Sequence, residues 1–315
     1  MQIQVSTDQM NPDSPAKSKW NIGWRLLRPH TLTASFIPVI IGTVLALPFP
    51  TFRIDLFAVM LLASILIQVS TNIFNEYFDY VRGLDHAHSI GIAGVIVRDG
   101  IAPAKILAAA KYVLAVALLL GFYLCYHSSW WLFPVGLCCI AVGYLYSGGP
   151  YPISATPFGE LAAGICMGLV IIVISFFIQT GAIDMAVILV SLPSSVLIGA
   201  ILMANNIRDL QDDKKHGRKT LAILLGRKSA NSCLIAMFIL SYAWILFLIA
   251  KDVLPLWSLL SFVSLPKAVE AARTFRQHTT QLALMPAMVA TAQTNTLFGF
   301  FLALGIFLHY LYPWH

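Results

Sequence analysis

The stretch LFAVMLLASILIQV at residues 56–69 is followed almost at once by NIFNEYFDYVRGLD at residues 72–85, so a strongly apolar run ends in amides and carboxylates. An apolar helix of about 20 residues is long enough to cross a bilayer. Ionisable side chains on such a helix are costly to desolvate and indicate a functional site. These residues therefore predict a membrane-spanning helix with chemistry at its end.

The composition of the whole chain is that of an integral membrane protein. Of its 315 residues, 58% are hydrophobic and 11% are charged, and the mean hydropathy is +0.79. Residues 1–28 are polar and lack the apolar core of a signal peptide, so we expect a cytoplasmic N-terminal tail and a single transmembrane domain at 29–315. No basic stretch interleaves with aromatic residues, which argues against nucleic acid as a partner.

Apolar stretches of membrane-spanning length occur at nine places and predict an all-α, multi-pass fold with nine transmembrane helices. They fall at 31–49, 56–80, 103–124, 130–147, 158–180, 185–207, 229–250, 253–270 and 295–312. The eighth is the weakest because it contains Pro255 and Pro266. The polar stretch 271–294 is left outside the spans, with a short helix there as the alternative. No linker or low-complexity segment divides the chain.

The positive charges are distributed unevenly across these nine spans. The side of the membrane that holds the N-terminal tail carries 18 of the 20 Lys and Arg residues, and the other side holds only Arg53 and Lys251. Cytoplasmic loops are enriched in Lys and Arg, so the basic side is expected to face the cytoplasm. The acidic end of the second helix lies on that side, and so does the end of the sixth.

Two helix ends repeat the same polar pattern. Asn75 and Asp79 are four residues apart, as are Asn205, Asp209 and Asp213. Side chains at this spacing share one face of an α-helix, so each end presents a column of oxygen atoms. Asn72 and Glu76 repeat the spacing on a neighbouring face of the second helix.

Clustered carboxylates favour a hard divalent cation. Mg²⁺ prefers oxygen ligands and is commonly held by one or two carboxylates while it bridges substrate phosphates. Two facing columns would suit a diphosphate, and Gly83 is a helix terminator that would turn Asp85 back toward the first column. The expected metal ligands are Asn75, Asp79, Asp85, Asn205, Asp209 and Asp213. The alternative is that these residues only solvate helix ends, with Asp209 and Asp213 paired to Lys214 or Arg218.

Several residues near the two columns are candidates for substrate binding. Basic side chains in the following loops can reach phosphate oxygens, and tyrosines at the end of the fourth helix can contact the substrate. The set comprises Asn72, Asn75, Arg98, Tyr144, Tyr146, Asn205, Lys214, Arg218 and Lys219. The alternatives are lipid headgroup contacts for the basic residues and membrane-interface anchoring for the tyrosines.

The motifs RPHTLTASFIPVIIGT, NIFNEYFDYVRGLD, YLYSGGPYPI, TPFGE, NNIRDLQDDKKHGRKTLA and AQTNTLFGFF, taken in order, resemble those of the UbiA superfamily of intramembrane aromatic prenyltransferases. Within it they are similar to the 1,4-dihydroxy-2-naphthoate prenyltransferases of menaquinone synthesis. The resemblance runs from about Trp24 to the end of the last helix. Two departures from the superfamily pattern are Gly83, where many members carry an aspartate, and the absence of Lys or Arg from the loop at 147–157.

The resemblance implies a helical bundle around a central cavity in a bacterial plasma membrane, with the active site facing the cytoplasm. A polyprenyl diphosphate would be held there through Mg²⁺, with Asp79, Asp209 and Asp213 as the catalytic carboxylates, and 1,4-dihydroxy-2-naphthoate would be the acceptor. Another acceptor such as 4-hydroxybenzoate is the alternative within the superfamily. An ion-coupled secondary transporter is the alternative from another class, although transporters place such charges near the bilayer midplane.

Overall fold

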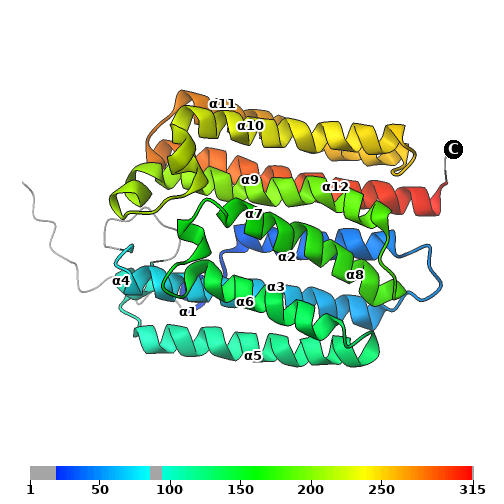
Figure 1. Ribbon diagram of the computed structural model, residues 1–315, viewed down its shortest axis with the longest axis horizontal. Helices are drawn as coiled ribbons and strands as arrows, with labels where there is room; N and C mark the ends of the chain where they lie inside the picture. Colours follow the sequence, from blue (N-terminus) through cyan, green and yellow to red (C-terminus); the bar gives the residue numbers. More distant parts are fainter. Residues whose placement is uncertain (1–18, 86–93, 314–315) are drawn as a thin grey trace, which may run out of the picture.

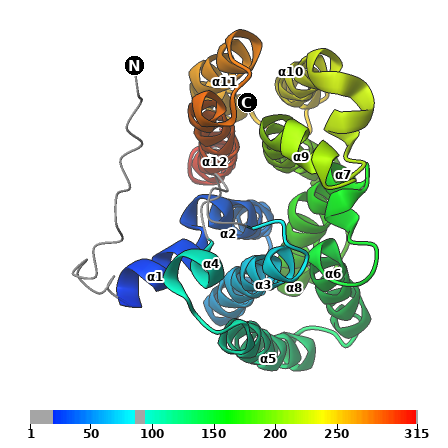
Figure 2. The same cartoon turned by 90° about the vertical axis from the view of Figure 1, so that its left-hand side faces the viewer.

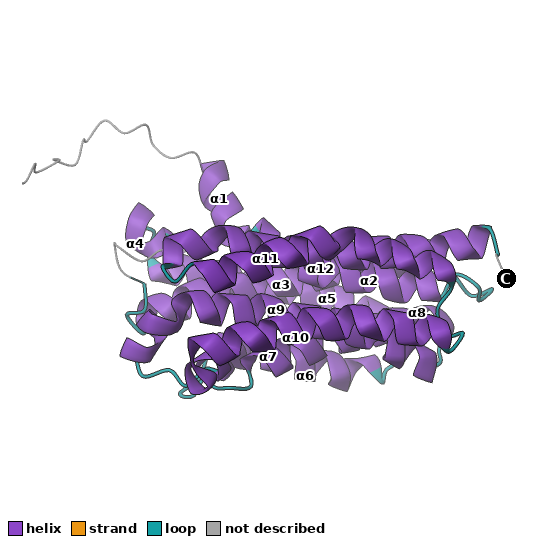
Figure 3. Ribbon diagram, turned by 90° about the horizontal axis from the view of Figure 1, so that it is seen from above, coloured by secondary structure: helices purple, strands orange, loops and turns teal. Residues whose placement is uncertain are grey.

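The computed structural model describes residues 19–85 and 94–313, and this part of the chain is helical without a strand (Figure 3). The helices are α1 (Lys19–Leu27), α2 (Pro29–Leu45), α3 (Ile54–Val81), α4 (Val95–Asp99), α5 (Pro103–His127), α6 (Leu132–Ser147), η1 (Ile153–Ala155), α7 (Gly159–Ala163), η2 (Gly164–Val170), α8 (Ile171–Thr180), α9 (Met185–Lys215), α10 (Leu221–Ala250), η3 (Leu256–Ser264), α11 (Leu265–Gln277) and α12 (Gln281–Leu311).

The long helices lie side by side along the longest axis of the molecule (Figure 1). Viewed end-on, α5 lies at one edge of the bundle and α10 and α11 at the opposite edge (Figure 2). Within the described residues, six helical segments are long and apolar enough to cross a membrane: α3, α5, the continuous segment 159–180, α9, α10 and α12. Two shorter apolar helices, Thr31–Leu45 and Leu132–Ser147, match two more of the predicted spans.

The exterior of the bundle is apolar, as expected for a surface in contact with lipid. Leu119 on α5, Ile239 on α10 and Leu282 on α12 are 67%, 63% and 72% exposed. A soluble protein rarely leaves so many large apolar side chains in contact with water. Together with the six spans, this surface identifies a multi-pass membrane protein.

Two predicted boundaries were wrong. The eighth span, expected at 253–270, is the 3₁₀ helix η3 continuing into α11 rather than one apolar helix. The last helix begins at Gln281 instead of 295. Its first half contains polar residues that face the bundle interior, including Thr291 and Thr294, whose hydroxyls donate to the carbonyls four residues earlier. Such internally satisfied side chains lower the hydropathy of a helix without exposing polar groups to lipid.

The N-terminal region contributes a helix of its own. Residues 1–18 of the predicted tail lie outside the described part, whereas residues 19–27 form α1. Arg25 of α1 forms an ion pair with Asp99 of α4. This pair links α1 to the segment that follows the first acidic motif.

The helical segment 159–180 is interrupted by η2, which has π-helical geometry. A side chain at Gly168 would place its Cβ 2.4 Å from the Cα of Ser195 on α9, so only glycine permits this close approach. π-Helical turns are rare and often occur at functional sites. Here the turn carries Cys166 and Met167, which line the internal cavity described below.

Candidate active site

The two acidic motifs end in the same backbone structure. In α3, the amide of Leu84 donates to the carbonyl of Asp79 at 2.9 Å and that of Gly83 to the carbonyl of Tyr80 at 3.0 Å. In α9, the amide of Arg218 donates to the carbonyl of Asp213 at 3.0 Å, and Gly217 donates to Lys214 at 3.2 Å. Both patterns are Schellman motifs, which require a left-handed residue after the helix.

Glycine meets that requirement at both ends. Gly83 has φ 67° and Gly217 has φ 73°, a region in which a side chain is unfavourable. The chain therefore leaves α3 at Gly83, and Asp85 turns back to line the same cavity as Asp79. This confirms the prediction that Gly83 terminates the helix and returns Asp85 toward the first column.

A cavity of about 490 Å³ opens between the two helix ends and extends into the bundle. It contains most of the predicted site residues. Those that line it are Asn72, Asn75, Asp79, Asp85, Tyr146, Asn205, Asp209, Asp213 and Arg218. The two columns, which are separated by more than a hundred residues in the sequence, therefore face one internal space.

Four other predicted substrate-binding residues do not line this cavity: Arg98, Tyr144, Lys214 and Lys219. Tyr144 packs edge-on against Phe74 and Phe78, with ring centroids 5.4 and 5.5 Å away. The other three side chains are exposed. Their role in substrate binding stays a prediction.

Arg218 joins the two motifs. Its Nη1 donates to Oδ1 of Asp213 at 3.0 Å, and its Nη2 lies 3.5 Å from Oδ1 of Asp79. The arginine therefore pairs with Asp213, as the simpler interpretation of the sequence anticipated, but it does so inside the cavity and between both columns. A guanidinium at this position can also reach a phosphate oxygen bound there.

Two further groups at the second motif were not among the residues predicted from the sequence. Arg208 donates from Nε to Oδ1 of Asp209 at 2.7 Å and from Nη2 to the other oxygen of the same carboxylate. Gln281, the first residue of α12, donates to Asp212 at 2.8 Å and to Asp209 at 3.3 Å. Arg208 is adjacent to Asp209 in the sequence and was a detectable candidate, whereas Gln281 lies in the polar stretch 271–294, which was left outside the predicted spans.

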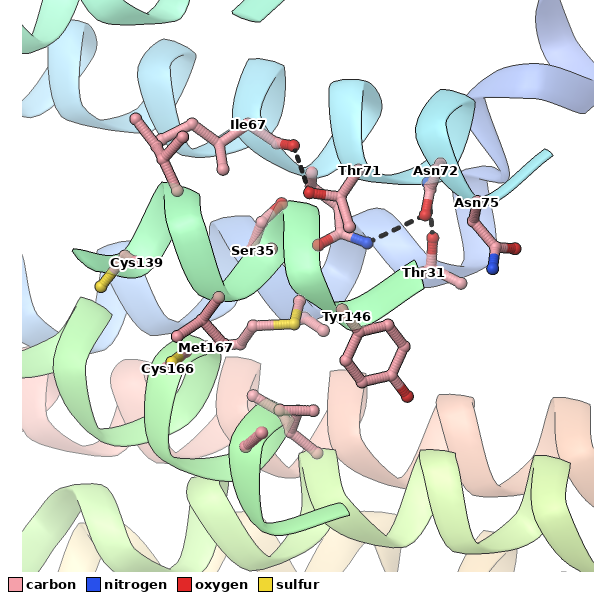
Figure 4. Close-up of a pocket in the computed structure, with 18 of the residues that line it drawn as sticks. Thr31, Ser35, Ile67, Thr71, Asn72, Asn75, Cys139, Tyr146, Cys166 and Met167 are labelled. Carbon is pink, nitrogen blue, oxygen red and sulfur yellow. Dashed lines mark hydrogen bonds between the residues drawn. The ribbon is translucent and has the colours of Figure 1, made fainter. Parts of the chain in front are cut away.

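Hydrogen bonds orient the amides of the first motif. The Asn75 side-chain nitrogen donates to the Ser147 hydroxyl at 3.0 Å, which leaves the amide oxygen for a ligand in the cavity. Asn72 donates to the carbonyl of Leu27 at 2.9 Å. It also donates to the Thr31 hydroxyl at 3.0 Å, the bond drawn between these two residues in Figure 4. Asn72 therefore fixes the start of α2 against α3.

Glu76 has a structural role, unlike Asn75 and Asp79 of the first column. Its carboxylate is 1% exposed and accepts hydrogen bonds from the backbone amides of Gly94, Val95 and Ile96. These amides lie at the start of α4, where a negative charge is favourable. Glu76 therefore anchors α4 to α3, and it is not among the residues that line the cavity.

The inner part of the cavity is apolar. Figure 4 shows Ile67 on α3, Cys139 on α6, and Cys166 and Met167 on η2 around this part, with Tyr146 nearer the polar residues. Small and flexible apolar side chains favour a hydrocarbon ligand. The cavity thus combines a polar mouth with an apolar interior.

The polar mouth has an excess of negative charge. Five carboxylates line the cavity, from Asp79, Asp85, Asp209, Asp212 and Asp213, against three guanidinium groups. In the described residues no three His, Cys, Asp or Glu side chains form a preassembled metal cluster. Arg208 and Arg218 are paired with carboxylates of the two columns. The donor set nevertheless fits a hard cation, since carboxylate and amide oxygens are the ligands that Mg²⁺ prefers and the uncompensated charge is negative.

Asp85 lies in the loop after α3 and has an altered acidity. Burial, followed by the nearby charges of Asp79 and Glu76, raises the pKa of Asp85 to about 6. Loss of hydration disfavours the ionised carboxyl, and neighbouring anions add to the effect. A cation bound beside Asp85 would relieve both.

Comparisons with known proteins agree with this geometry. Residues 35–283 match the model of the UbiA prenyltransferase family. The Bacillus subtilis protein named 1,4-dihydroxy-2-naphthoate octaprenyltransferase is 51% identical over 294 residues, which cover 93% of this chain and 94% of that protein.

Solved structures share the fold at low identity. A UbiA homologue from Aeropyrum pernix aligns with a TM-score of 0.62 and 16% identity, over 90% of this chain and 98% of its own. A UbiA homologue from Archaeoglobus fulgidus, bound to DMAPP and Mg²⁺, aligns with a TM-score of 0.56 and 17% identity, over 89% of this chain and 98% of its own. The arrangement of helices is therefore that of these proteins.

Proposed function

The chain belongs to the UbiA prenyltransferase family, and we propose that it transfers a polyprenyl group from polyprenyl diphosphate to 1,4-dihydroxy-2-naphthoate. Diphosphate and CO₂ are released and demethylmenaquinol is formed, a step of menaquinone biosynthesis. The observation that carries the proposal is the 51% identity to a protein of this name over most of both chains. The cavity supports it independently, because two acidic columns meet at the mouth of an apolar chamber.

The reaction divides between the two parts of the cavity. The allylic C–O bond breaks and its electron pair leaves with the diphosphate, which Arg218 is placed to contact between the two columns. Asn75, Asp79, Asp85, Asn205, Asp209 and Asp213 would hold Mg²⁺, which supplies positive charge beside the leaving diphosphate. The apolar interior takes the prenyl chain and excludes water from the electrophilic carbon.

The acceptor completes the reaction without a covalent enzyme intermediate. Its electron-rich ring attacks the allylic carbon and forms the new C–C bond. The bond to the carboxyl group breaks, its electron pair returns to the ring, and CO₂ departs. The electron pair of the broken C–O bond leaves with the diphosphate and that of the broken C–C bond restores the ring, so the reaction needs no oxidant. The released diphosphate is more basic than its prenyl ester and takes up a proton from the solvent near neutral pH.

We also propose the membrane topology. The nine crossings would comprise the six long segments, α2, α6, and η3 together with α11. The uneven distribution of Lys and Arg supports a cavity mouth on the cytoplasmic side of a bacterial plasma membrane. Soluble 1,4-dihydroxy-2-naphthoate would then enter from the cytoplasm, while the prenyl chain remains at membrane depth.

A panel of acceptors tests the proposed function. Purified protein is incubated with one polyprenyl diphosphate, Mg²⁺, and either 1,4-dihydroxy-2-naphthoate or 4-hydroxybenzoate. We expect a prenylated product from the naphthoate and at most a trace from the benzoate, with none from Asp209→Asn. Preference for 4-hydroxybenzoate would show that the naphthoate is not the acceptor. The absence of a product from either acceptor would rule out the proposed prenyltransferase activity.

A further inference from the structure

We propose that Arg28 binds the carboxylate of the aromatic acceptor and so determines acceptor specificity. The inference rests on the proposed function and deepens it, because none of the motifs identified in the sequence assigns a residue to this carboxylate. It follows from the state of the three guanidinium groups that line the cavity, those of Arg28, Arg208 and Arg218.

Two of these groups are already engaged by carboxylates of the second motif. Arg208 contacts both oxygens of Asp209, and Arg218 pairs with Asp213 and approaches Asp79. Arg28 differs. Its nearest ion-pair partner is Glu76, with 3.8 Å between Nη2 and Oε2, which exceeds hydrogen-bonding distance.

The side chain of Arg28 also has an unsatisfied donor. Its Nε is buried and has no hydrogen-bond partner among the residues that the structure describes. A buried N–H without a partner is unfavourable, because it has lost its hydration without gaining a hydrogen bond. Glu76 cannot supply the partner without releasing the amides at the start of α4. A ligand carboxylate in the cavity would satisfy the fork formed by Nε and an Nη.

The backbone of Arg28 is held in an uncommon conformation that fixes this side chain at the cavity. Its φ of 48° and ψ of 64° lie in the left-handed region, between α1 and α2. Asn72 binds the carbonyl of Leu27 and the hydroxyl of Thr31, which in turn donates to the carbonyl of Arg28. Strain retained by surrounding contacts occurs preferentially at functional sites.

The position of Arg28 suits the acceptor better than the diphosphate. Arg218 pairs with a carboxylate of each column, where the diphosphate is expected, whereas Arg28, at the start of α2, has its ion-pair contact with Glu76 on the helix of the first column. The acceptor carboxylate is a substituent of the ring that is attacked, so its binding group must lie at the cavity but beside, rather than between, the columns. A planar guanidinium recognises a carboxylate through two parallel hydrogen bonds.

Direct binding tests the proposal without turnover. The stable analogues 1-hydroxy-2-naphthoate and 1-naphthol are titrated into the full-length protein in the absence of Mg²⁺ and prenyl diphosphate. We expect the wild type to prefer the carboxylate analogue by about tenfold or more, as for a charge-assisted hydrogen bond. Arg28→Gln should lose this preference while its affinity for 1-naphthol is unchanged. Arg25→Gln, which removes a neighbouring charge outside the cavity, should retain it.

A second variant covers the possibility that Arg28→Gln folds poorly. Arg28→Gly keeps the left-handed backbone without strain, so it should remain folded and show the same loss of preference. Equal loss of affinity for both analogues in Arg28→Gly would indicate a structural role and overturn the proposal. Retained preference for 1-hydroxy-2-naphthoate would also overturn it.

Steady-state kinetics separate this inference from the proposed function. In the Arg28 variants the KM for 1,4-dihydroxy-2-naphthoate should rise about tenfold or more, with little change in the KM for polyprenyl diphosphate. A rise only in the KM for polyprenyl diphosphate would reassign Arg28 to the diphosphate. A wild type that does not prenylate the naphthoate rejects the proposed function itself, whereas normal wild-type activity with unchanged variant kinetics rejects only the role of Arg28.

Discussion

The main-chain carbonyls of Asp79 and Asp213 accept equivalent hydrogen bonds, from the amides of Leu84 and Arg218 at 2.9 and 3.0 Å. Each aspartate therefore occupies the same position relative to the end of its helix, and each helix ends at a left-handed glycine. The repeated geometry directs both carboxylates toward one guanidinium, that of Arg218. The two acidic motifs are thus alike in backbone structure as well as in sequence.

Replacing a carboxylate in either column should nearly abolish turnover. We expect Asp79→Asn and Asp209→Asn each to lower kcat by at least about 100-fold, because each removes a charge that compensates a cation beside the diphosphate. Both variants should still insert and elute as the wild type does in size-exclusion chromatography. Near wild-type activity in either variant would contradict a metal site built on both motifs.

Removing the Arg218 guanidinium, which bridges Asp79 and Asp213, should increase the stabilisation of the protein by Mg²⁺. In Arg218→Gln, Asp79 and Asp213 lose their shared partner and repel each other. We expect a lower melting temperature without Mg²⁺, a larger increase in melting temperature on adding Mg²⁺ than in the wild type, and a higher KM for polyprenyl diphosphate. The measurement is a thermal melt at several Mg²⁺ concentrations. If Mg²⁺ raises the melting temperature of Arg218→Gln by the same amount as that of the wild type, Mg²⁺ does not bind between the columns.

The turn at Gly83 should be sensitive to a methyl group for conformational rather than steric reasons. No atom of the described residues lies within 4 Å of a Cβ built at Gly83, but its φ of 67° is left-handed. Gly83→Ala should therefore destabilise the turn by about 1 kcal/mol, favour another turn of α3 and move Asp85 away from the cavity.

Gly23 provides a matched control for this substitution. It is also free of contacts within 4 Å but lies inside α1 without a positive φ. Gly23→Ala should leave activity intact, whereas Gly83→Ala should raise the Mg²⁺ concentration needed for half-maximal rate. Identical Mg²⁺ titrations for the two variants would exclude a role for the turn.

The acidity of Asp85 predicts how Mg²⁺ dependence changes with pH. Its pKa of about 6 means that the side chain is ionised above pH 6 and largely protonated below it. Protons should therefore compete with the cation, so the half-maximal Mg²⁺ concentration should rise as pH falls from 7.5 to 5.5. The change should be smaller in Asp85→Asn, measured in parallel at both pH values. Equal pH dependence in the two proteins would leave Asp85 outside the metal site.

Much of the polar site was predictable because it depends on local rules. The four-residue spacing of Asn75 and Asp79 places both on one helix face, and Gly83 allows the turn that returns Asp85. Both features follow from the geometry of a single helix and of its C-terminal end, which can be recognised in the sequence. We also expected from the sequence that the two columns face each other. In the structure α3 and α9 are arranged so that both columns line one cavity.

Other parts of the site depend on packing that the sequence does not reveal. Lys214 and Lys219 follow the second motif but point to the exterior, whereas Arg208 and Gln281 reach its carboxylates. Gln281 was missed because buried threonines make the first half of α12 look polar. The role of Glu76 was also hidden, since its partners are backbone amides of α4 and backbone amides have no sequence signature.

The most direct test of the central claim is the stoichiometry of the two small products. Wild-type protein is supplied with polyprenyl diphosphate, Mg²⁺ and 1,4-dihydroxy-2-naphthoate labelled in its carboxyl carbon, and labelled CO₂ and diphosphate are measured in the same sample. We expect equal amounts of both, appearing together and only when both substrates are present. Diphosphate release without labelled CO₂, or no release of either, would contradict prenyl transfer to this acceptor.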